Sequence, residues 1–315
     1  MKIDISKNKL IIIITAIVLF AAAAVSVFFW LISKQIIVEP GATVLADGTV
    51  IPPEKEKVFQ IVSPRPFNER RADLIAAKEI NPKAFAWLSV PGTNIEYPVI
   101  LDPENDNSYW LQRKLDGTTV ENQSYTNAET VVYAHYKGEF PGISPGSGEI
   151  SRNLTFFGHN WNNCSIPYYI GDSGDGTYIM FEQLMSFTDY DFSRGHQYIY
   201  LATETGDYVY QVFSSMYCEP SWKPEFDFNY FDPSPGDAQF ETLLSEMKER
   251  SLFDFDVPVS SGDKIITLST CTLYYEGAAE QRYVVSARLL GKGEKADRLA
   301  KVEINRDYKK PSFVK

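Results

Sequence analysis

Cys271 is the side chain whose type and place in the sequence best fit an enzyme nucleophile. It ends the stretch Lys264–Cys271 (KIITLSTC), which alternates and is rich in β-branched residues as expected of a strand, and the polar Thr272 follows it. A cysteine at a strand end can present its sulfur to solvent, although a lone cysteine is more often a small buried residue. Catalysis by Cys271 requires a thiolate, and therefore a basic or cationic neighbour.

Two of the three histidines follow apolar strands and are candidate bases. His159 comes after Leu154–Gly158 (LTFFG), and His135 comes after residues 131–134 (VVYA). The sequence pattern alone does not exclude His135 as the base. His196 follows a glycine at the start of a strand and has the position of a turn residue.

An arginine could complete a thiol-based acyl-transfer site, because its permanent charge stabilises an oxyanion at any pH. Arg282 opens a Val-rich strand that follows Cys271 after a short loop, and hairpin pairing would bring both residues to one rim of a sheet. Arg288 lies in the same strand and shares the pleat parity of Arg282. The alternation of side chains along the strand therefore leaves both arginines possible as the residue that stabilises the oxyanion.

Length and composition limit the other functions open to the chain. Its 315 residues include 30 Lys and Arg against 41 Asp and Glu, giving a net charge of −11. This balance argues against nucleic-acid binding, which needs a basic surface. With 44% hydrophobic residues, the chain is also not disordered throughout. Only 3 histidines are present, without an HExxH or CxxC motif, so we expect no metal and no other cofactor.

Residues 10–32 form an uncharged apolar stretch long enough to cross a bilayer as a helix. A cleaved signal peptide is the alternative, but its apolar core is usually shorter. Three lysines precede the stretch, so the positive-inside rule predicts a cytoplasmic tail at 1–9 and an extracellular remainder. We expect a single-pass membrane protein with a proline-dotted linker at 33–67, an extracellular catalytic domain at 68–292 and a C-terminal tail at 293–315.

The patterning of the ectodomain predicts a mainly β fold with flanking helices. Helical composition covers 69–80 and stops at Asn81-Pro82, and a second helix is expected to begin at Pro235 after a Ser234 cap. Short strands separated by turn residues favour a barrel or a sandwich over alternating βαβ units. They are predicted at 96–101, 130–134, 154–158, 197–202, 208–217, 264–270 and 283–290.

Three motifs resemble those of the sortase family. Thr267–Cys271 (TLSTC) resembles the TLxTC signature of sortases, and Gly158-His159-Asn160 resembles their histidine motif. Arg282, eleven residues after the cysteine, matches the sortase arginine, and the order His, Cys, Arg also agrees. Further stretches are similar to class B sortases, namely Asn81–Pro98, Ser108–Leu111, Met180–Phe192 and the helical segment 237–250. Together with the three motifs, the resemblance spans roughly residues 68–290.

Two features depart from the class B pattern. Class B members can carry an Asp two residues after the cysteine, but Leu273 stands here, so a third catalytic acid at that place is not supported. The segment after His159 is also longer than expected and contains Cys164. Cys164 could approach the active site, bond to Cys218 or have no role, and we favour no role.

The resemblance implies a closed or nearly closed sortase-type β-barrel that acts as a cysteine transpeptidase on the surface of a Gram-positive bacterium. Cys271 would attack a peptide bond in a C-terminal sorting signal and form a thioacyl-enzyme. His159 would protonate the leaving amine and then deprotonate an incoming amine, and Arg282 would stabilise the oxyanion.

The strand before the cysteine is expected to line the peptide groove through Leu268, Ser269 and Thr270, although Leu268 fits core packing equally well. The resemblance implies a surface protein bearing a sorting signal as one partner and a peptidoglycan-precursor amine as the acceptor. A pilin-polymerising enzyme, with a lysine of another subunit as acceptor, is the first alternative. A thiol hydrolase and a non-catalytic surface binding domain also stay open.

Overall fold

The computed structural model separates the chain into two units, Met1–Val58 and Phe59–Lys315. In the first unit it describes an antiparallel pair of short strands, β1 (Thr43–Val44) and β2 (Val50–Ile51). In the second unit it describes residues 59–105, 108–120, 130–135, 150–219, 228–232, 235–276 and 280–314. None of the helices in these described parts combines the length and the apolar character needed to cross a bilayer. The anchor predicted at 10–32 lies outside them.

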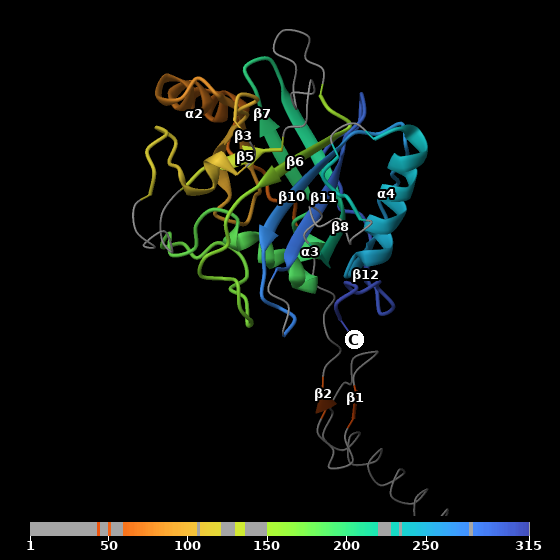
Figure 1. The fold of residues 1–315 in the computed structure, drawn as a ribbon. Coiled ribbons are helices and arrows are strands. Elements are labelled where there is room, and N and C mark those ends of the chain that lie inside the picture. The colour runs from red at the N-terminus through yellow and green to blue at the C-terminus, as the bar shows by residue number, and fades with distance from the viewer. Residues whose placement is uncertain are drawn as a thin grey trace, which may run out of the picture. The chain divides into compact units, whose positions relative to one another are not determined.

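Eight strands of the second unit close into a barrel (Figure 1), which confirms the predicted mainly β barrel fold. Two neighbouring pairs, β6 with β10 and β4 with β5, are parallel, and the other pairs are antiparallel. Around the barrel the order is β10 (Ile265–Cys271), β11 (Arg282–Leu289), β8 (Asp207–Cys218), β7 (Tyr198–Ala202), β3 (Ala84–Ser89), β4 (Glu96–Ile100), β5 (Val132–Ala134) and β6 (Asn153–Phe157).

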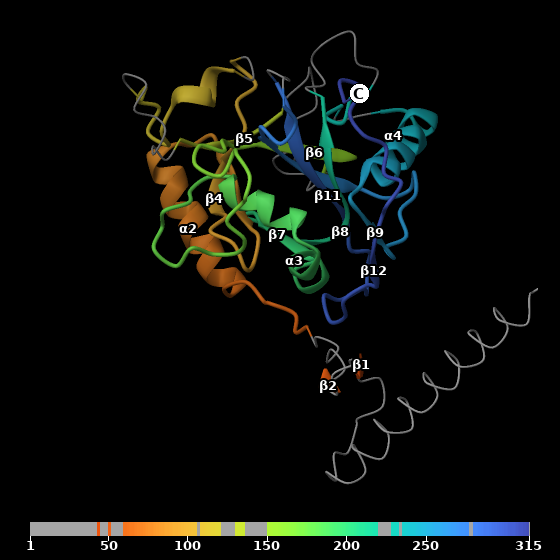
Figure 2. The same cartoon turned by 90° about the horizontal axis from the view of Figure 1, so that it is seen from below.

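The helices cover the barrel on opposite sides. α2 (Phe67–Ile80) and α4 (Asp237–Arg250) flank it in both views (Figures 1 and 2). Shorter helical segments connect the strands, namely η1 (Tyr109–Gln112), η3 (Glu182–Thr188) and α3 (Tyr190–Gly195). An apolar stripe of α4 is buried in the main core through Phe240, Leu243, Leu244 and Met247. Burial of these side chains is the main force that holds the helix on the sheet.

The start of α4 differs from the prediction. The helix begins at Asp237 rather than at Pro235, with Gly236 as its N-cap. The side-chain oxygen of Gln239 accepts a hydrogen bond from the Gly236 backbone N–H (3.2 Å), which satisfies a donor at the helix start. Ser234, the predicted cap, lies outside the described residues.

Three strands of the second unit are not predicted from the sequence. β3 follows the turn at Asn81-Pro82 almost at once, and it is buried on both faces near its end, so it lacks clean alternation. β9 (Phe253–Phe255) and β12 (Val302–Ile304) have three residues each, too few for a periodic signal. β12 lies in the segment predicted to be a C-terminal tail. Its antiparallel pairing with β9 packs that segment against the rest of the second unit.

A substitution in β3 tests whether this strand completes the core. Leu88 has no exposed surface in the main cluster, so Leu88→Ala should lower the free energy of unfolding by about 2–5 kcal/mol. The matched control is Ile80→Ala, because Ile80 is 58% exposed and its truncation should cost less than about 0.5 kcal/mol. Urea denaturation of both variants measures the difference, and equal losses would show that β3 does not carry core packing.

Candidate active site

Cys271 and Arg282 face each other at one rim of the barrel. They are Cα partners in the antiparallel pairing of β10 with β11, and opposed residues of such a pair project to the same face of the sheet. Both residues are half-buried, so each is partly accessible to solvent. The Arg282 guanidinium donates to the Gln281 carbonyl oxygen (2.8 Å). The register therefore places a permanent cation beside the thiol.

His159 reaches the same rim because β6 runs parallel to β10. Thr270 Oγ1 donates to the carbonyl oxygen of Gly158 (2.7 Å). The residues that follow are Cys271 and His159, which are therefore adjacent in these two neighbouring segments. The glycine is required here, since a Cβ would lie 2.5 Å from the ring of Phe181. The Phe181 backbone N–H in turn donates to the His159 carbonyl oxygen (2.9 Å). Strand pairing thus sets the histidine level with the cysteine.

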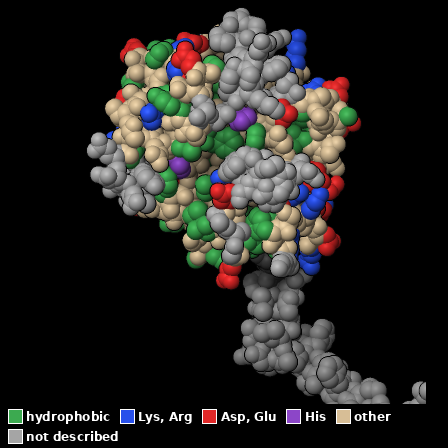
Figure 3. Space-filling model, viewed as in Figure 1, with side chains coloured by type: hydrophobic (Ala, Val, Ile, Leu, Met, Phe, Trp, Pro, Cys, Tyr) green, Lys and Arg blue, Asp and Glu red, His purple; other side chains and the backbone are tan. Residues whose placement is uncertain are grey.

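A cavity of about 520 Å³ opens beside these three residues. Its wall is largely aromatic or apolar and comprises Leu111, Tyr133, His135, Phe157 and Phe231. Figure 3 shows a hollow in this face where hydrophobic side chains gather, with histidine side chains on either side of it. A substrate that fills such a cavity would displace water from the reacting atoms and so strengthen the electrostatic interactions there.

Burial and hydrogen bonding set the protonation of His159. Its Nε2 lies 2.6 Å from the Leu111 carbonyl oxygen, which only accepts, so Nε2 carries a hydrogen and Nδ1 is the nitrogen that takes up a proton. Burial lowers the pKa of His159 below its usual 6.5, the hydrogen bond to Leu111 opposes this, and the charge of Arg282 adds to it. The imidazole is therefore neutral at pH 7 and can act as a base.

The structure separates the two arginines that alternation leaves possible. Arg288 pairs with Ile265 at the far end of β10 from Cys271. Its guanidinium makes two hydrogen bonds to the carboxylate of Glu294 (2.9 and 3.1 Å). Arg288 is thus a buried structural ion pair, and Arg282 is the arginine at the cavity.

The three residues expected to bind substrate, Leu268, Ser269 and Thr270, occupy two different environments. Ser269 and Thr270 line the cavity. Leu268 is instead fully buried in the core, so we do not retain it as a binding residue. Leu268 lies deeper along β10, where its side chain packs in the main core, whereas Ser269 and Thr270 lie at the end of the strand next to Cys271. Ser269 Oγ is hydrogen-bonded to the Tyr230 hydroxyl (2.9 Å), which connects this strand to the segment that supplies Phe231.

The other two histidines have different surroundings. His135 also lines the cavity, and its ring packs against Phe231 with 4.5 Å between centroids. His196 is the C-cap of α3 and stacks on Phe192 (4.0 Å), which agrees with its assignment as a turn residue. His159 is thus the histidine level with Cys271, while His135 contributes to the cavity wall.

The remaining cysteines are free thiols. Cys218 is fully buried, and burial raises its pKa far above the usual range. Cys164 is half-buried, and burial raises its pKa to about 11, so it is protonated at pH 7. The Leu273 backbone N–H donates to the Cys164 carbonyl oxygen (2.9 Å), so Cys164 lies beside the active-site rim. The structure does not form the Cys164–Cys218 disulfide that the sequence left open beside the favoured absence of a role.

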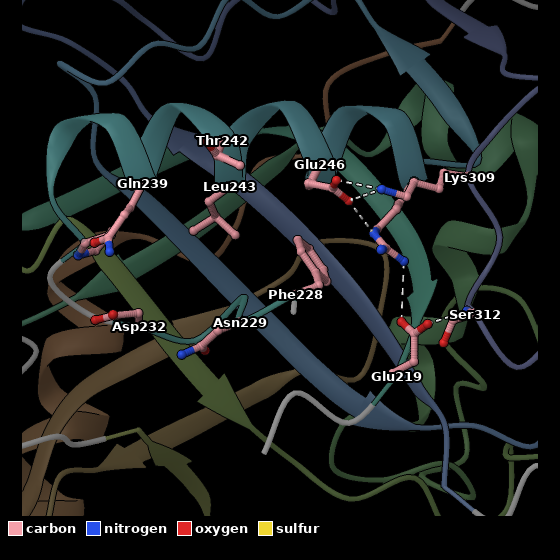
Figure 4. Close-up of a pocket in the computed structure, with 12 residues that line it drawn as sticks. Glu219, Phe228, Asn229, Asp232, Gln239, Thr242, Leu243, Glu246, Lys309 and Ser312 are labelled. Atoms are coloured by element: carbon pink, nitrogen blue, oxygen red, sulfur yellow. Dashed lines mark hydrogen bonds and ion pairs between the residues drawn. The ribbon is translucent and has the colours of Figure 1, made fainter. Parts of the chain in front are cut away.

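A second cavity, of about 620 Å³, lies between α4, residues 228–232 and the C-terminal segment. Four of its charged residues are paired with each other: Arg250 donates to Glu246 (2.9 Å) and Glu219 (3.4 Å), and Lys309 donates to Glu246 (2.6 Å) (Figure 4). Its lining residues in the described chain include neither cysteine nor histidine. This cavity does not contain the groups that thiol chemistry needs.

Two residues beside the site, Trp161 and Glu182, are not predicted from the sequence. The Trp161 indole stacks on the His159 imidazole, with 3.9 Å between centroids and 22° between planes. Glu182 is fully buried, and its carboxylate accepts hydrogen bonds from the loop that carries Trp161. The available signal is an acid within the apolar stretch Met180–Leu184.

Comparisons with known proteins agree with this geometry. The Sortase domain family model matches residues 88–290. Sortase B from Listeria monocytogenes is 25% identical over 232 residues, covering 71% of this chain and 76% of the relative. A solved Staphylococcus aureus sortase B–substrate complex has a TM-score of 0.51 and 23% identity, covering 70% and 85% of the two chains. A solved sortase B complexed with triglycine has a TM-score of 0.52 and 23% identity, covering 70% and 86%.

The match to the family extends over more than half of the chain, and it includes Cys271, His159 and Arg282. The eight-stranded barrel agrees with the solved sortase B structures. The chain therefore belongs to the sortase family of cysteine transpeptidases.

Proposed function

We propose that this sortase is anchored in the cell membrane and joins surface proteins to an amine of a cell-wall precursor through a thioacyl-enzyme on Cys271. The observation that carries the proposal is the pairing of Cys271 with Arg282 across β10 and β11, with His159 beside the same cavity. A thiol, a neutral imidazole and a fixed guanidinium are the groups that acyl transfer requires.

The first half of the reaction forms the thioester. Cys271 Sγ attacks the carbonyl carbon of a Thr–Gly or similar bond in the sorting signal, and its proton moves to His159 Nδ1. Arg282 donates hydrogen bonds to the oxyanion that forms on the carbonyl oxygen. The C–N bond then breaks as His159 returns the proton to the leaving amine.

The second half transfers the acyl group. An incoming amine attacks the thioester carbonyl, loses a proton to His159, and leaves a new amide bond and a free Cys271 thiol. The largely apolar cavity supports aminolysis over hydrolysis, because a peptide bound in it displaces water from the thioester. The triglycine complex of a sortase B supports an amino-terminal glycine as the acceptor class.

Membrane anchoring rests on the apolar stretch at 10–32 and the lysines before it. An anchored enzyme with its catalytic domain outside the cell would meet secreted proteins as they cross the membrane. Fractionation of a cell that expresses the full chain, with protease applied from outside, tests this topology. Cleavage of the catalytic domain with a protected N-terminal tail agrees with the proposal, whereas a fully protected chain contradicts it.

The nucleophile is tested by Cys271→Ala. We expect no thioacyl-enzyme and no turnover of a sorting peptide containing NP-x-T-x, because the attacking sulfur is gone. Cys164→Ala is the matched control and should keep turnover near that of the unmodified protein. Mass spectrometry of products with added triglycine measures both, and transpeptidation by Cys271→Ala would refute the mechanism.

The two arginines should respond differently to the same change. Arg282→Lys should lower kcat by about 100-fold, because a lysine cannot reproduce the planar donor geometry toward the oxyanion. Arg288→Lys keeps a positive charge beside Glu294, away from the cavity, and should leave kcat near its original value. Steady-state kinetics compare them, and an equal effect of the two changes would remove Arg282 from the mechanism.

The lowered pKa of His159 predicts the acid limb of the activity profile. Activity should fall as the pH drops through a midpoint below 6.5, because a protonated imidazole cannot accept the Cys271 proton. Replacing Arg282 by Met removes a charge that lowers this pKa, so the His159 midpoint should move up. NMR titration of the imidazole measures the midpoint directly, and a value above 6.5 in the unmodified chain would contradict the account.

A further inference from the structure

Glu182 is a buried acid that the mechanism above does not use. It is the first residue of η3 and has no exposed surface. Its carboxylate contacts the backbone of the loop that follows His159. A buried carboxylate is costly unless its oxygens are hydrogen-bonded, so its partners indicate why it is there.

Both carboxylate oxygens of Glu182 accept hydrogen bonds from the backbone. Oε1 accepts from the N–H groups of Trp161 (3.0 Å) and Asn162 (2.8 Å), and Oε2 accepts from the N–H of Ile179 (2.7 Å). The Glu182 carbonyl oxygen also accepts from the side-chain amide of Asn163 (3.1 Å). One residue therefore ties three consecutive residues of the loop to η3.

The same loop is tied to the nucleophile on its other side. The side-chain amide of Asn160 donates to the carbonyl oxygens of Cys271 (2.8 Å) and Asn163 (3.2 Å). His159 is thus followed by a short loop that is held by β10 through Asn160 and by η3 through Glu182. Glu182 binds the backbone N–H of Trp161, and the Trp161 indole lies flat against the His159 imidazole.

We propose that Glu182 is a positioning residue for transpeptidation: its carboxylate fixes the loop so that the Trp161 indole stacks on the His159 imidazole and holds it for proton transfer with Cys271. The inference rests on the proposed function of His159. The indole shields one face of the imidazole from water, which is consistent with the lowered pKa of His159 and its cause, burial. Glu182 acts through Trp161 and does not contact substrate.

Glu182→Gln is the sharpest change, because it keeps the shape of the side chain. Glutamine has one acceptor oxygen, so it cannot accept from all three N–H groups, and its own amide hydrogens face them. We expect kcat with a sorting peptide and triglycine to fall by about 10- to 100-fold, the size of effect produced by a small misplacement of a catalytic group. The KM for the peptide should change less than twofold.

One measurement does not depend on the identity of the peptide. In the full chain in detergent, NMR titration of His159 should give a midpoint closer to 6.5 in Glu182→Gln and in Trp161→Ala. Trp161→Phe keeps an aromatic ring against the imidazole and should recover most of the activity and the original midpoint.

The matched control is Glu219→Gln in the second cavity. Glu219 is also buried and accepts from a backbone N–H, that of Ser312, but it pairs with Arg250 in the second cavity, and neither residue lines the cavity beside Cys271 (Figure 4). This change can lower stability but should leave the His159 midpoint unchanged. A general loss of packing would therefore be separated from a loss of positioning.

A double-mutant cycle decides whether Glu182 acts through Trp161. The combined Glu182→Gln, Trp161→Ala variant should lose no more activity than Trp161→Ala alone. Losses that multiply, or a His159 midpoint unchanged in Glu182→Gln, would overturn the inference. If Glu182→Gln does not fold, Trp161→Ala alone decides, because an unchanged kcat and midpoint would remove the stack from the mechanism. An unmodified chain without transpeptidation would instead refute the proposed function.

Discussion

The active site depends on the register of one strand, β10, between its two neighbours. Its parallel pairing with β6 sets His159 level with Cys271, and its antiparallel pairing with β11 sets Arg282 opposite Cys271. A slip of one residue in either pairing would turn one of these three side chains to the other face of the sheet. The three groups come from distant parts of the sequence, so the backbone ladders of a closed barrel are what bring them together.

The environment of these groups decides what they can do. The cavity wall is largely aromatic, and burial keeps the His159 imidazole neutral near pH 7 while Arg282 stays charged. A neutral base and a fixed cation beside one thiol suit acyl transfer, in which a proton moves and negative charge develops on an oxygen. The buried carboxylate of Glu182 belongs to the same arrangement, because it fixes the loop that carries the stacked indole.

The sequence predicts the barrel and the three central residues because both leave local signals. Cys271 and His159 stand at the ends of apolar strands, and the TLSTC and GHN motifs add a specific resemblance. Arg282 and Arg288 share parity, so only strand pairing and the ion pair with Glu294 separate them. What the sequence does not predict depends on contacts distant along the chain. Leu268 stands three residues before the cysteine in the same strand, yet its side chain packs in the main core and does not line the cavity. Glu182 meets Trp161 only because the path of the loop brings them together, about twenty residues apart.

The central claim is that acyl transfer passes through the sulfur of Cys271. Intact-mass and peptide-level mass spectrometry of the full chain with an NP-x-T-x peptide measures it most directly. The account predicts an acyl adduct on the Cys271 peptide that disappears when triglycine is added, with the acyl group recovered as a triglycine amide. An adduct on another residue, or release of the free acid alone with triglycine present, would contradict it.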